Sequence, residues 1–468
     1  MEKNTLVQVL GTFSRQEWRE LDGWLRTPLH NKDPEVIQLF EYLQRQIQSG
    51  QSLPEAPEVA RLALLPGRQH TDHLHHVSSY LMKAVSDYLL WAELNRQPLS
   101  ERQHRLSEIL RRRQLGKQAA RFQLRAEEGL QRQASRGRWY YELHAAIQQE
   151  KVQLQEWQNT LQHHNLQPLL TAQDLRFLVE KLQTGCLLLS QKAVSAREYD
   201  PGLLDMLTQL PEAHPYLQEP AVALYYHGYR ALSEPDGEPH FRRLKALLTR
   251  YSELFKGDEL RNLYLLAVNF CIRRINRSER AFLREVFELY QSGLAQGAFL
   301  EQGQLSRFTY TNIAQAGMGL GEFSWVAQFL HEHKIYLPED IREPVSQFNL
   351  ARLFYETGES GKALACLLNI GYDDTVYNFA AKTLLAKIYF ARGEWNALDS
   401  LLDSISAYIR RKKVAGYHRD SYLGFVKIMR RLLSADLSQR AQRAALREKI
   451  AAMKVLAERE WLSGLVAG

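Results

Sequence analysis

Apolar residues recur every three or four positions along most of the chain, which is the spacing of one face of an α-helix. The first such face predicts a helix that begins after Ser14 and runs to about Leu25. Ser14 and Glu17 have the spacing of a capping box, with Phe13 and Trp18 placed to form the hydrophobic staple around it. No long stretch alternates apolar and polar residues, so we expect an all-α protein without a sheet.

Two further helices are predicted in the N-terminal part. One begins at Asp33, with Pro34 in the first helical position. A loop containing proline and glycine then spans roughly 49–67. The helix that begins at Asp33 has an apolar face made of Val36, Leu39, Phe40, Leu43 and Ile47. The other helix follows the loop and has an apolar face made of Leu74, Val77, Leu81, Val85, Tyr88 and Leu89. We therefore expect residues 1–95 to form a helical N-terminal domain.

Long helices rich in glutamine and arginine are predicted over residues 96–215. Gly116, the turn at residues 135–137 and Pro168 separate them, and Thr171 is a plausible cap for the last one. Four prolines, at positions 201, 211, 215 and 220, then mark a break between the two halves of the chain.

A helical hairpin pattern recurs in the second half. A Leu or Ile precedes a small residue at Ala314, Ala351 and Ala386, at intervals of 37 and 35 residues. Further along the chain from each alanine, a glycine marks the turn, at Gly321, Gly358 and Gly393. A looser copy of the pattern begins at Leu266 and Ala267. A small residue lets two helices approach closely, and glycine permits the left-handed conformation that ends a helix.

This pattern resembles the tetratricopeptide repeat, a helix-turn-helix unit of about 34 residues. The usual proline between repeats is missing, and the intervals vary. The resemblance implies an α-α superhelix, or solenoid, over residues 216–435, because each hairpin buries its apolar face only against its neighbours. Residues 436–468 are then expected to cap the last repeat with one helix, from about Ser438 to Leu462.

A second resemblance lies near the N-terminus. Residues 24–32 (WLRTPLHNK), followed by the helix that contains residues 36–42, are similar to a family of uncharacterised bacterial proteins. In that family a short helix, a Pro-Asn-Lys turn and a helix rich in serine and aspartate precede a repeat region. Residues 80–90, with Ser86 and Asp87, correspond to that last helix. The resemblance implies no activity.

Composition favours a folded protein of the cytoplasm. Apolar residues make up 45% of the chain and charged residues 24%, as in folded globular proteins. No run of apolar residues is long enough to span a membrane, and the stretch from Leu6 to Leu10 is too short for a signal peptide. Cys186, Cys271 and Cys366 form no metal-binding pair, so we expect reduced thiols.

Positive charge is concentrated in two places. Residues 101–138 contain eleven Arg and Lys against four Glu, and residues 409–431 contain eight against a single Asp. Such stretches hold phosphates in nucleic-acid-binding proteins, but they are also ordinary solvated helix faces. The candidate anion-binding residues are Arg111, Arg112, Arg113, Arg410, Arg411, Lys412 and Lys413.

No catalytic, metal or cofactor motif is complete. His70, His73, His75 and His76 form a short cluster, but a metal site needs further ligands and an orienting shell, so we expect exposed, non-binding side chains. The glycines at 317, 319 and 321 lie at a helix turn and not after a strand, as a dinucleotide loop requires. We therefore predict a protein that is not an enzyme and carries no cofactor.

The candidate binding site is the groove of the predicted solenoid. In tetratricopeptide proteins the positions just after the small residue, and three further on, line the concave surface. Here they form a polar-to-basic row and an apolar row, suited to an acidic or carboxylate-ended peptide. Packing between repeats is the alternative role for the aromatic members. The rows consist of Gln315, Arg352 and Lys387, and of Met318, Tyr355 and Phe390.

The leading functional hypothesis is therefore a non-enzymatic scaffold that binds a protein or peptide segment in this groove. The alternative is a nucleic-acid-binding regulatory protein that uses the two basic stretches.

Overall fold

The computed structural model describes residues 4–50, 52–157, 165–192, 199–368, 375–411 and 416–467. These described residues are all-α apart from one hairpin of two-residue strands, and the chain forms two compact units. Unit 1 consists of residues 1–133 and 142–173, and unit 2 of residues 134–141 and 174–468. The division into four domains predicted from the sequence stays a prediction.

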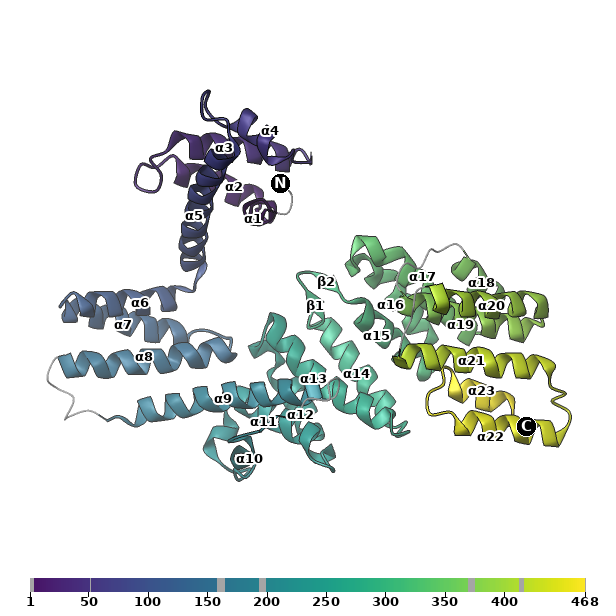
Figure 1. The fold of residues 1–468 in the computed structure, drawn as a ribbon. Coiled ribbons are helices and arrows are strands. Elements are labelled where there is room, and N and C mark those ends of the chain that lie inside the picture. Colours follow the sequence, from purple (N-terminus) through teal and green to yellow (C-terminus); the bar gives the residue numbers. More distant parts are fainter. Residues whose placement is uncertain are drawn as a thin grey trace. The chain divides into compact units, whose positions relative to one another are not determined.

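Seven helices belong to unit 1 alone (Figure 1). They are α1 Thr5–Gly11, α2 Arg15–Leu25, α3 Pro34–Gln48, α4 Ala56–Ala63, α5 Thr71–Arg96, α6 Leu99–Arg112 and α7 Gly116–Gln131. Two more helices, α8 Arg138–Trp157 and α9 Gln167–Lys192, contribute residues to both units.

The predicted starts of α2 and α3 are confirmed. The Glu17 amide donates to Ser14 Oγ over 3.2 Å, and the Ser14 amide donates to Glu17 Oε2 over 2.8 Å. The Phe13 and Trp18 rings pack edge to face, with centroids 5.8 Å apart. Asp33 caps α3 by accepting the Glu35 amide over 2.9 Å.

Two helices were missed in the sequence. Helix α1 is capped by Asn4 and buries Leu6, Val7 and Leu10, the stretch considered only as a signal peptide. Helix α4 lies within the predicted loop at 49–67 and buries one face against α3 and α5. Both are short helices whose stability comes from packing and not from helix propensity.

Small and polar side chains join α6 to α7. A Cβ atom added at Gly129 would lie 3.2 Å from the Ser100 Cβ, so the two helices nearly touch there. Ser107 Oγ donates to the Ala119 carbonyl over 3.0 Å, and this serine is fully buried. Such close packing leaves the longer side chains of both helices to face outward.

The predicted cap at Thr171 is wrong, because α9 already begins at Gln167 and includes Thr171. Pro168 occupies the first turn of this helix, where a backbone N–H would have no partner within the helix. The proline therefore starts the helix and does not break it.

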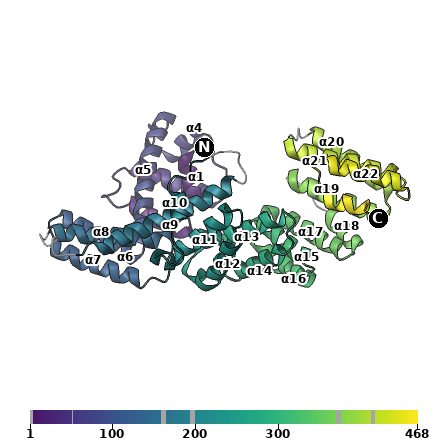
Figure 2. The ribbon, with the colours of Figure 1, turned by 90° about the horizontal axis from the view of Figure 1, so that it is seen from below.

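Unit 2 continues with helices that, from α11 onward, pack on their neighbours in the sequence (Figures 1 and 2). They are α10 Leu204–Leu207, α11 Pro220–Ser233, α12 Glu238–Tyr251, α13 Gly257–Ile275, α14 Phe282–Ala295, α15 Arg307–Gly319, α16 Phe323–His333, α17 Glu339–Glu356, α18 Ser360–Leu368, α19 Thr375–Arg392, α20 Trp395–Arg411 and α21 Gly416–Ser434. Short 3₁₀ turns are Pro215–Gln218, Ser252–Leu254 and Lys334–Tyr336.

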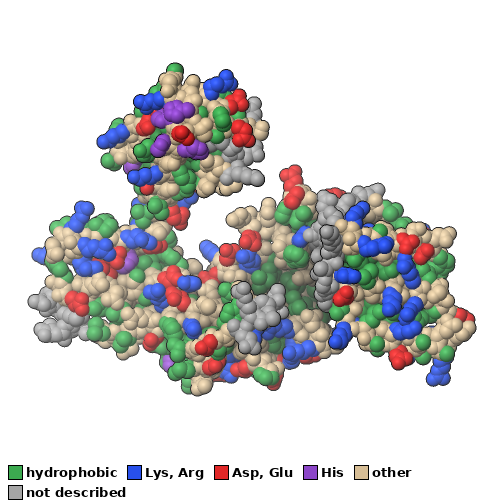
Figure 3. Space-filling model, in the orientation of Figure 1, with side chains coloured by type: hydrophobic (Ala, Val, Ile, Leu, Met, Phe, Trp, Pro, Cys, Tyr) green, Lys and Arg blue, Asp and Glu red, His purple; other side chains and the backbone are tan. Residues whose placement is uncertain are grey.

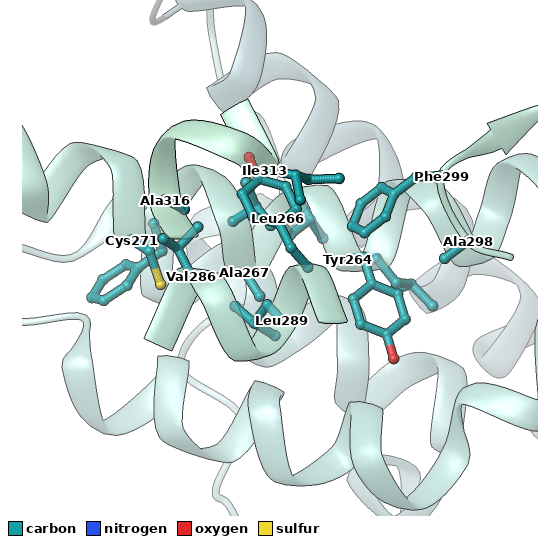
Figure 4. Close-up of a cluster of buried hydrophobic side chains, with 14 of the residues drawn as sticks. Tyr264, Leu266, Ala267, Cys271, Val286, Leu289, Ala298, Phe299, Ile313 and Ala316 are labelled. Carbon is teal, nitrogen blue, oxygen red and sulfur yellow. The ribbon is translucent and has the colours of Figure 1, made fainter. Parts of the chain in front are cut away.

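The repeated small residues lie where helices meet. Ala267, Ala314, Ala351 and Ala386 have no solvent exposure. Gly321, Gly358 and Gly393 have φ angles of 77°, 80° and 69°, and each separates two helices. Figure 4 shows the core that results, in which Tyr264 and Leu266 of α13 lie beside Ile313 of α15 and Phe299.

The expectation of no sheet is wrong at one place. Strands β1 Leu300–Glu301 and β2 Gln304–Leu305 pair antiparallel between α14 and α15. The two residues between them, Gln302 and Gly303, have φ angles of 51° and 80°. Two positive φ angles are typical of the tight turn that joins hairpin strands.

The single capping helix predicted from Ser438 to Leu462 is also wrong. Two helices are present, α22 Arg440–Ala452 and α23 Arg459–Leu465. Glu458 ends the break between them in the left-handed conformation, with φ 55° and ψ 34°. Leu462 and Val466 lie in the core that α19, α20 and α21 form.

No helix among the described residues is both long enough and apolar enough to cross a membrane. The three cysteines are reduced: Cys186 and Cys271 are buried, and Cys366 is half-buried on α18.

Candidate functional site

Residues of the two predicted rows lie on three successive odd-numbered helices of unit 2. On α15, Gln315 is exposed, and Met318 is buried with 8% exposure. On α17, Arg352 and Tyr355 are half-buried, and the Arg352 guanidinium carbon lies 5.9 Å from the centre of the Phe348 ring. Met318 therefore belongs to the core, whereas the other residues reach the surface.

Lys387 of α19 is the centre of a cluster that joins α17, α19 and α23. Its Nζ lies 2.9 Å from Glu458 Oε2, and its side chain is only 13% exposed. The same Nζ lies 5.0 Å from the centre of the Tyr355 ring and 5.5 Å from that of Trp461. A carboxylate and two ring faces therefore surround one ammonium group, which combines an ion pair with two cation–π contacts.

Phe390, one turn further along α19, extends this cluster. Its ring packs edge to face on Trp461, with centroids 5.8 Å apart, and on Trp395, with centroids 5.6 Å apart. Burial raises the pKa of the neighbouring Tyr355, so its phenol stays neutral at physiological pH. We call Tyr355, Lys387, Phe390, Glu458 and Trp461 the lysine cluster.

An open cleft adjoins the lysine cluster. Its volume is about 840 Å³, and Phe390 and Trp395 form one wall. Trp395 is 52% exposed, which is unusual for so large an apolar side chain. The opposite wall comes from α21 and the residues after it, including Arg430 and Leu433.

The arginine run at 111–113 divides into two environments. Arg111 Nε and Nη2 each lie 2.9 Å from one oxygen of Glu150, whose side chain is 1% exposed. The pKa of Arg111 is raised by this hydrogen-bonded partner. Arg112 and Arg113 are exposed instead, as are Lys117 and Arg121 on α7. Figure 3 shows basic side chains gathered over this part of unit 1.

The second basic stretch lies only partly within the described residues. Arg410 and Arg411 end α20 and are exposed, and the Arg411 guanidinium carbon lies 5.8 Å from the Tyr408 ring centre. Lys412 and Lys413 lie outside the described residues.

The histidines at 70–76 do not converge. His73 Nε2 lies 2.8 Å from Glu35 Oε2, and Arg68 Nη1 lies 3.0 Å from the same oxygen. His73 and Arg68 hold the pKa of Glu35 below its ordinary value, although burial opposes them. His75 and His76 are exposed. Among the described residues, no three potential ligands come together as a metal site would require.

The glycine run at 317–321 packs helices. A Cβ atom added at Gly317 would lie 2.5 Å from Val326 Cγ2, so this glycine allows α15 to approach α16. Gly321 supplies the left-handed turn that ends the α15 segment. Neither position follows a strand, as a dinucleotide loop would require.

A buried histidine pair links α11 and α12. The Nδ1 atoms of His227 and His240 lie 2.9 Å apart, so one of the two rings donates a hydrogen bond to the other. His240 Nε2 lies 3.5 Å from Glu234 Oε2. Burial and the neighbouring His240 lower the pKa of His227 to about 4. The sequence offered no signal for this pair, because the two histidines are thirteen residues apart.

Three residues of the lysine cluster and its cleft were missed in the sequence: Glu458, Trp461 and Trp395. Trp395 was not identified as a candidate site residue. Glu458 and Trp461 fall within the single helix predicted from Ser438 to Leu462, and that prediction included no bend at Glu458. The left-handed backbone at Glu458 reverses that expectation, and nothing in a glutamate residue predicts such a backbone.

Comparison with models of known protein families finds no matching family, and comparison with curated proteins finds no similar sequence.

Proposed function

We propose that the chain is a non-enzymatic scaffold of the tetratricopeptide type, which binds a peptide or protein segment in the groove of a helical-repeat solenoid. The buried alanines, the left-handed glycines and the packing of consecutive helices support stacked helix pairs. The groove is lined by Gln315, Arg352, Tyr355, Lys387 and Phe390.

One observation carries this proposal: Phe390 belongs both to the lysine cluster and to the wall of the open cleft of about 840 Å³. The cluster offers a cation with aromatic surfaces, and the cleft adds the exposed Trp395. Aromatic side chains in a partly open pocket beside a charged group are common anchors at protein interfaces. An acidic segment with an aromatic or aliphatic side chain fits this combination.

Charge reversal in the groove tests the proposal. Arg352→Glu combined with Lys387→Glu is expected to abolish capture of protein partners by the tagged chain from its native cells, measured by quantitative mass spectrometry. Arg112→Glu combined with Arg113→Glu is the matched control, because it makes the same change of charge at exposed positions of unit 1. Equal capture by both double variants, with unchanged circular dichroism, contradicts the groove assignment.

A second function, nucleic-acid binding, is favoured by one observation. Within the described part of the chain, the exposed Arg112, Arg113, Lys117 and Arg121 form no ion pair with a carboxylate. Exposed cations without a carboxylate partner can contact nucleic-acid phosphates and release their counterions. Binding to nucleic acid then weakens steeply as the salt concentration rises. An electrophoretic retardation assay at two salt concentrations checks this, and the absence of a shift at low salt excludes it.

A further inference from the structure

The turn from Glu458 to Trp461 makes the contacts that a ligand of the groove would make. Glu458 provides the carboxylate for Lys387, and Trp461 covers the same ammonium group and the edge of Phe390. Two of the six residues predicted as ligand-binding, Lys387 and Phe390, therefore contact a segment of this same chain. That segment lies 71 residues after Lys387, so the contact is tertiary and does not belong to a repeat.

We propose that this turn is an intramolecular occupant of the groove, and that a partner displaces it by presenting the same chemistry. The proposal rests on the function proposed above and names the partner's binding element. That element is the start of a helix, with an acidic residue at the cap and a tryptophan three residues later.

The spacing follows from helix geometry. Glu458 is the N-cap of α23, and Trp461 is the third residue inside the helix. Residues three apart lie on the same side of a helix, so the carboxylate and the indole reach Lys387 together. A negative charge is also favourable at a helix N-terminus. A partner helix that begins in the same way reproduces both contacts.

Two features of this segment favour its release from the groove. Glu458 has a left-handed backbone conformation, which costs free energy for residues other than glycine. Release of the segment allows Glu458 to leave this conformation. Helix α23 has only seven residues, which is too short to be stable in isolation. Leu462 and Val466, which are fully buried, hold the segment against α19–α21 and oppose its release. A partner must therefore replace these contacts as well.

Competition with a synthetic peptide tests the proposal. The probe is a fluorescent peptide with the sequence of residues 456–467, measured by anisotropy against the full chain. Glu458→Gln combined with Trp461→Ala weakens the attachment of the chain's own segment, which then depends on Leu462 and Val466 and is more easily displaced. We call this double substitution the open variant. This variant is expected to bind the probe at least about tenfold more tightly than the wild-type chain, because the wild type must first release its own segment. Adding Lys387→Glu to the variant is expected to remove that binding.

The control peptide carries the same two replacements and is expected not to bind. Binding of the probe to the wild-type chain as tightly as to the open variant overturns the inference but leaves the proposed function standing. No binding to a folded open variant also overturns it, and partner capture then decides the proposed function separately.

A second measurement does not depend on the fold of the variant. Hydrogen exchange of the wild-type chain is followed with and without saturating probe. The amides of residues 459–465 are expected to exchange faster in its presence, while those of α15 and α16 stay unchanged. Unchanged exchange at 459–465 with the probe bound contradicts displacement.

Discussion

The α6–α7 hairpin and the helices α17 and α19 both carry basic side chains, but they place them differently. On α6 and α7 the helices meet through Ser100, Ser107 and Gly129, so the arginines project into solvent. On α19 a single lysine is enclosed by two aromatic rings and a carboxylate. A run of charge therefore predicts an exposed face, whereas one cation with an aromatic environment indicates a recognition site.

The largest expected effect on stability is at Arg111, which, unlike Arg112 and Arg113, pairs with a buried carboxylate. Arg111→Ala leaves Glu150 buried without its cation, which is expected to cost about 3–5 kcal/mol of unfolding free energy. Urea denaturation followed by circular dichroism measures this cost. Arg112→Ala is the control on the same helix. Equal small effects of both substitutions would show that the run at 111–113 is uniformly exposed after all.

The second largest effect is expected when the pH is lowered. It concerns unit 2, which contains the buried pair His227 and His240. The folded-state pKa of His227, about 4, lies below its ordinary value of 6.5, so the unfolded chain takes up the proton first as the pH falls. Stability from this group is full above pH 6.5 and is lost toward pH 4. The loss amounts to about 3 kcal/mol at most.

Hydrogen exchange at several pH values checks this prediction, after correction for the intrinsic exchange rate. The free energy of opening of α11 and α12 is expected to fall between pH 6.5 and pH 4. His227→Gln is expected to flatten that dependence. A wild-type profile without a slope in this window contradicts a buried, neutral pair.

Replacing glycine by alanine is expected to have different effects on the stability of α15 and of α7. Gly317→Ala places a methyl group 2.5 Å from Val326 Cγ2, and such overpacking is expected to cost about 1–3 kcal/mol. Gly129→Ala meets Ser100 at 3.2 Å, where a small shift suffices. The gain in helix propensity, about 1 kcal/mol, then leaves this second variant near the wild-type stability. Thermal denaturation of the two variants gives the difference, and equal midpoints would contradict it.

The smallest effect is expected for Arg112→Ala combined with Arg113→Ala, which should change the unfolding free energy by less than about 0.5 kcal/mol. If the chain binds nucleic acid, however, each lost arginine lowers the slope of affinity against salt by about one. Urea denaturation and a salt titration separate the two roles. A large loss of stability would show that these side chains are structural.

Much of the fold could be predicted because its signals are local. The Ser14–Glu17 capping box, Asp33 before Pro34 and the glycines at 321, 358 and 393 each act within a few residues, and each is found as expected. The predicted rows also brought Tyr355, Lys387 and Phe390 into one cluster. The role of these rows in binding stays a prediction.

The rest depended on contacts between distant segments. Helices α1 and α4 are stabilised by the core that they join, and their own sequences are short. The pairing of Arg111 with Glu150 spans 39 residues, and a charge count at 101–138 does not reveal it. The break at Glu458 also depends on distant contacts, because Leu462 and Val466 after it pack into the core formed by α19–α21.

The unequal burial of the three cysteines gives the chain a built-in handle for spectroscopy. Cys186 and Cys271 are shielded, whereas Cys366 is half-buried on α18, between α17 and α19 in the sequence. Burial raises the pKa of all three thiols, so a maleimide dye requires mildly alkaline conditions and reacts first at Cys366. The natural sequence can thus be labelled at one site, and with a second dye on an added peptide the distance between the two dyes can be followed without removing any cysteine.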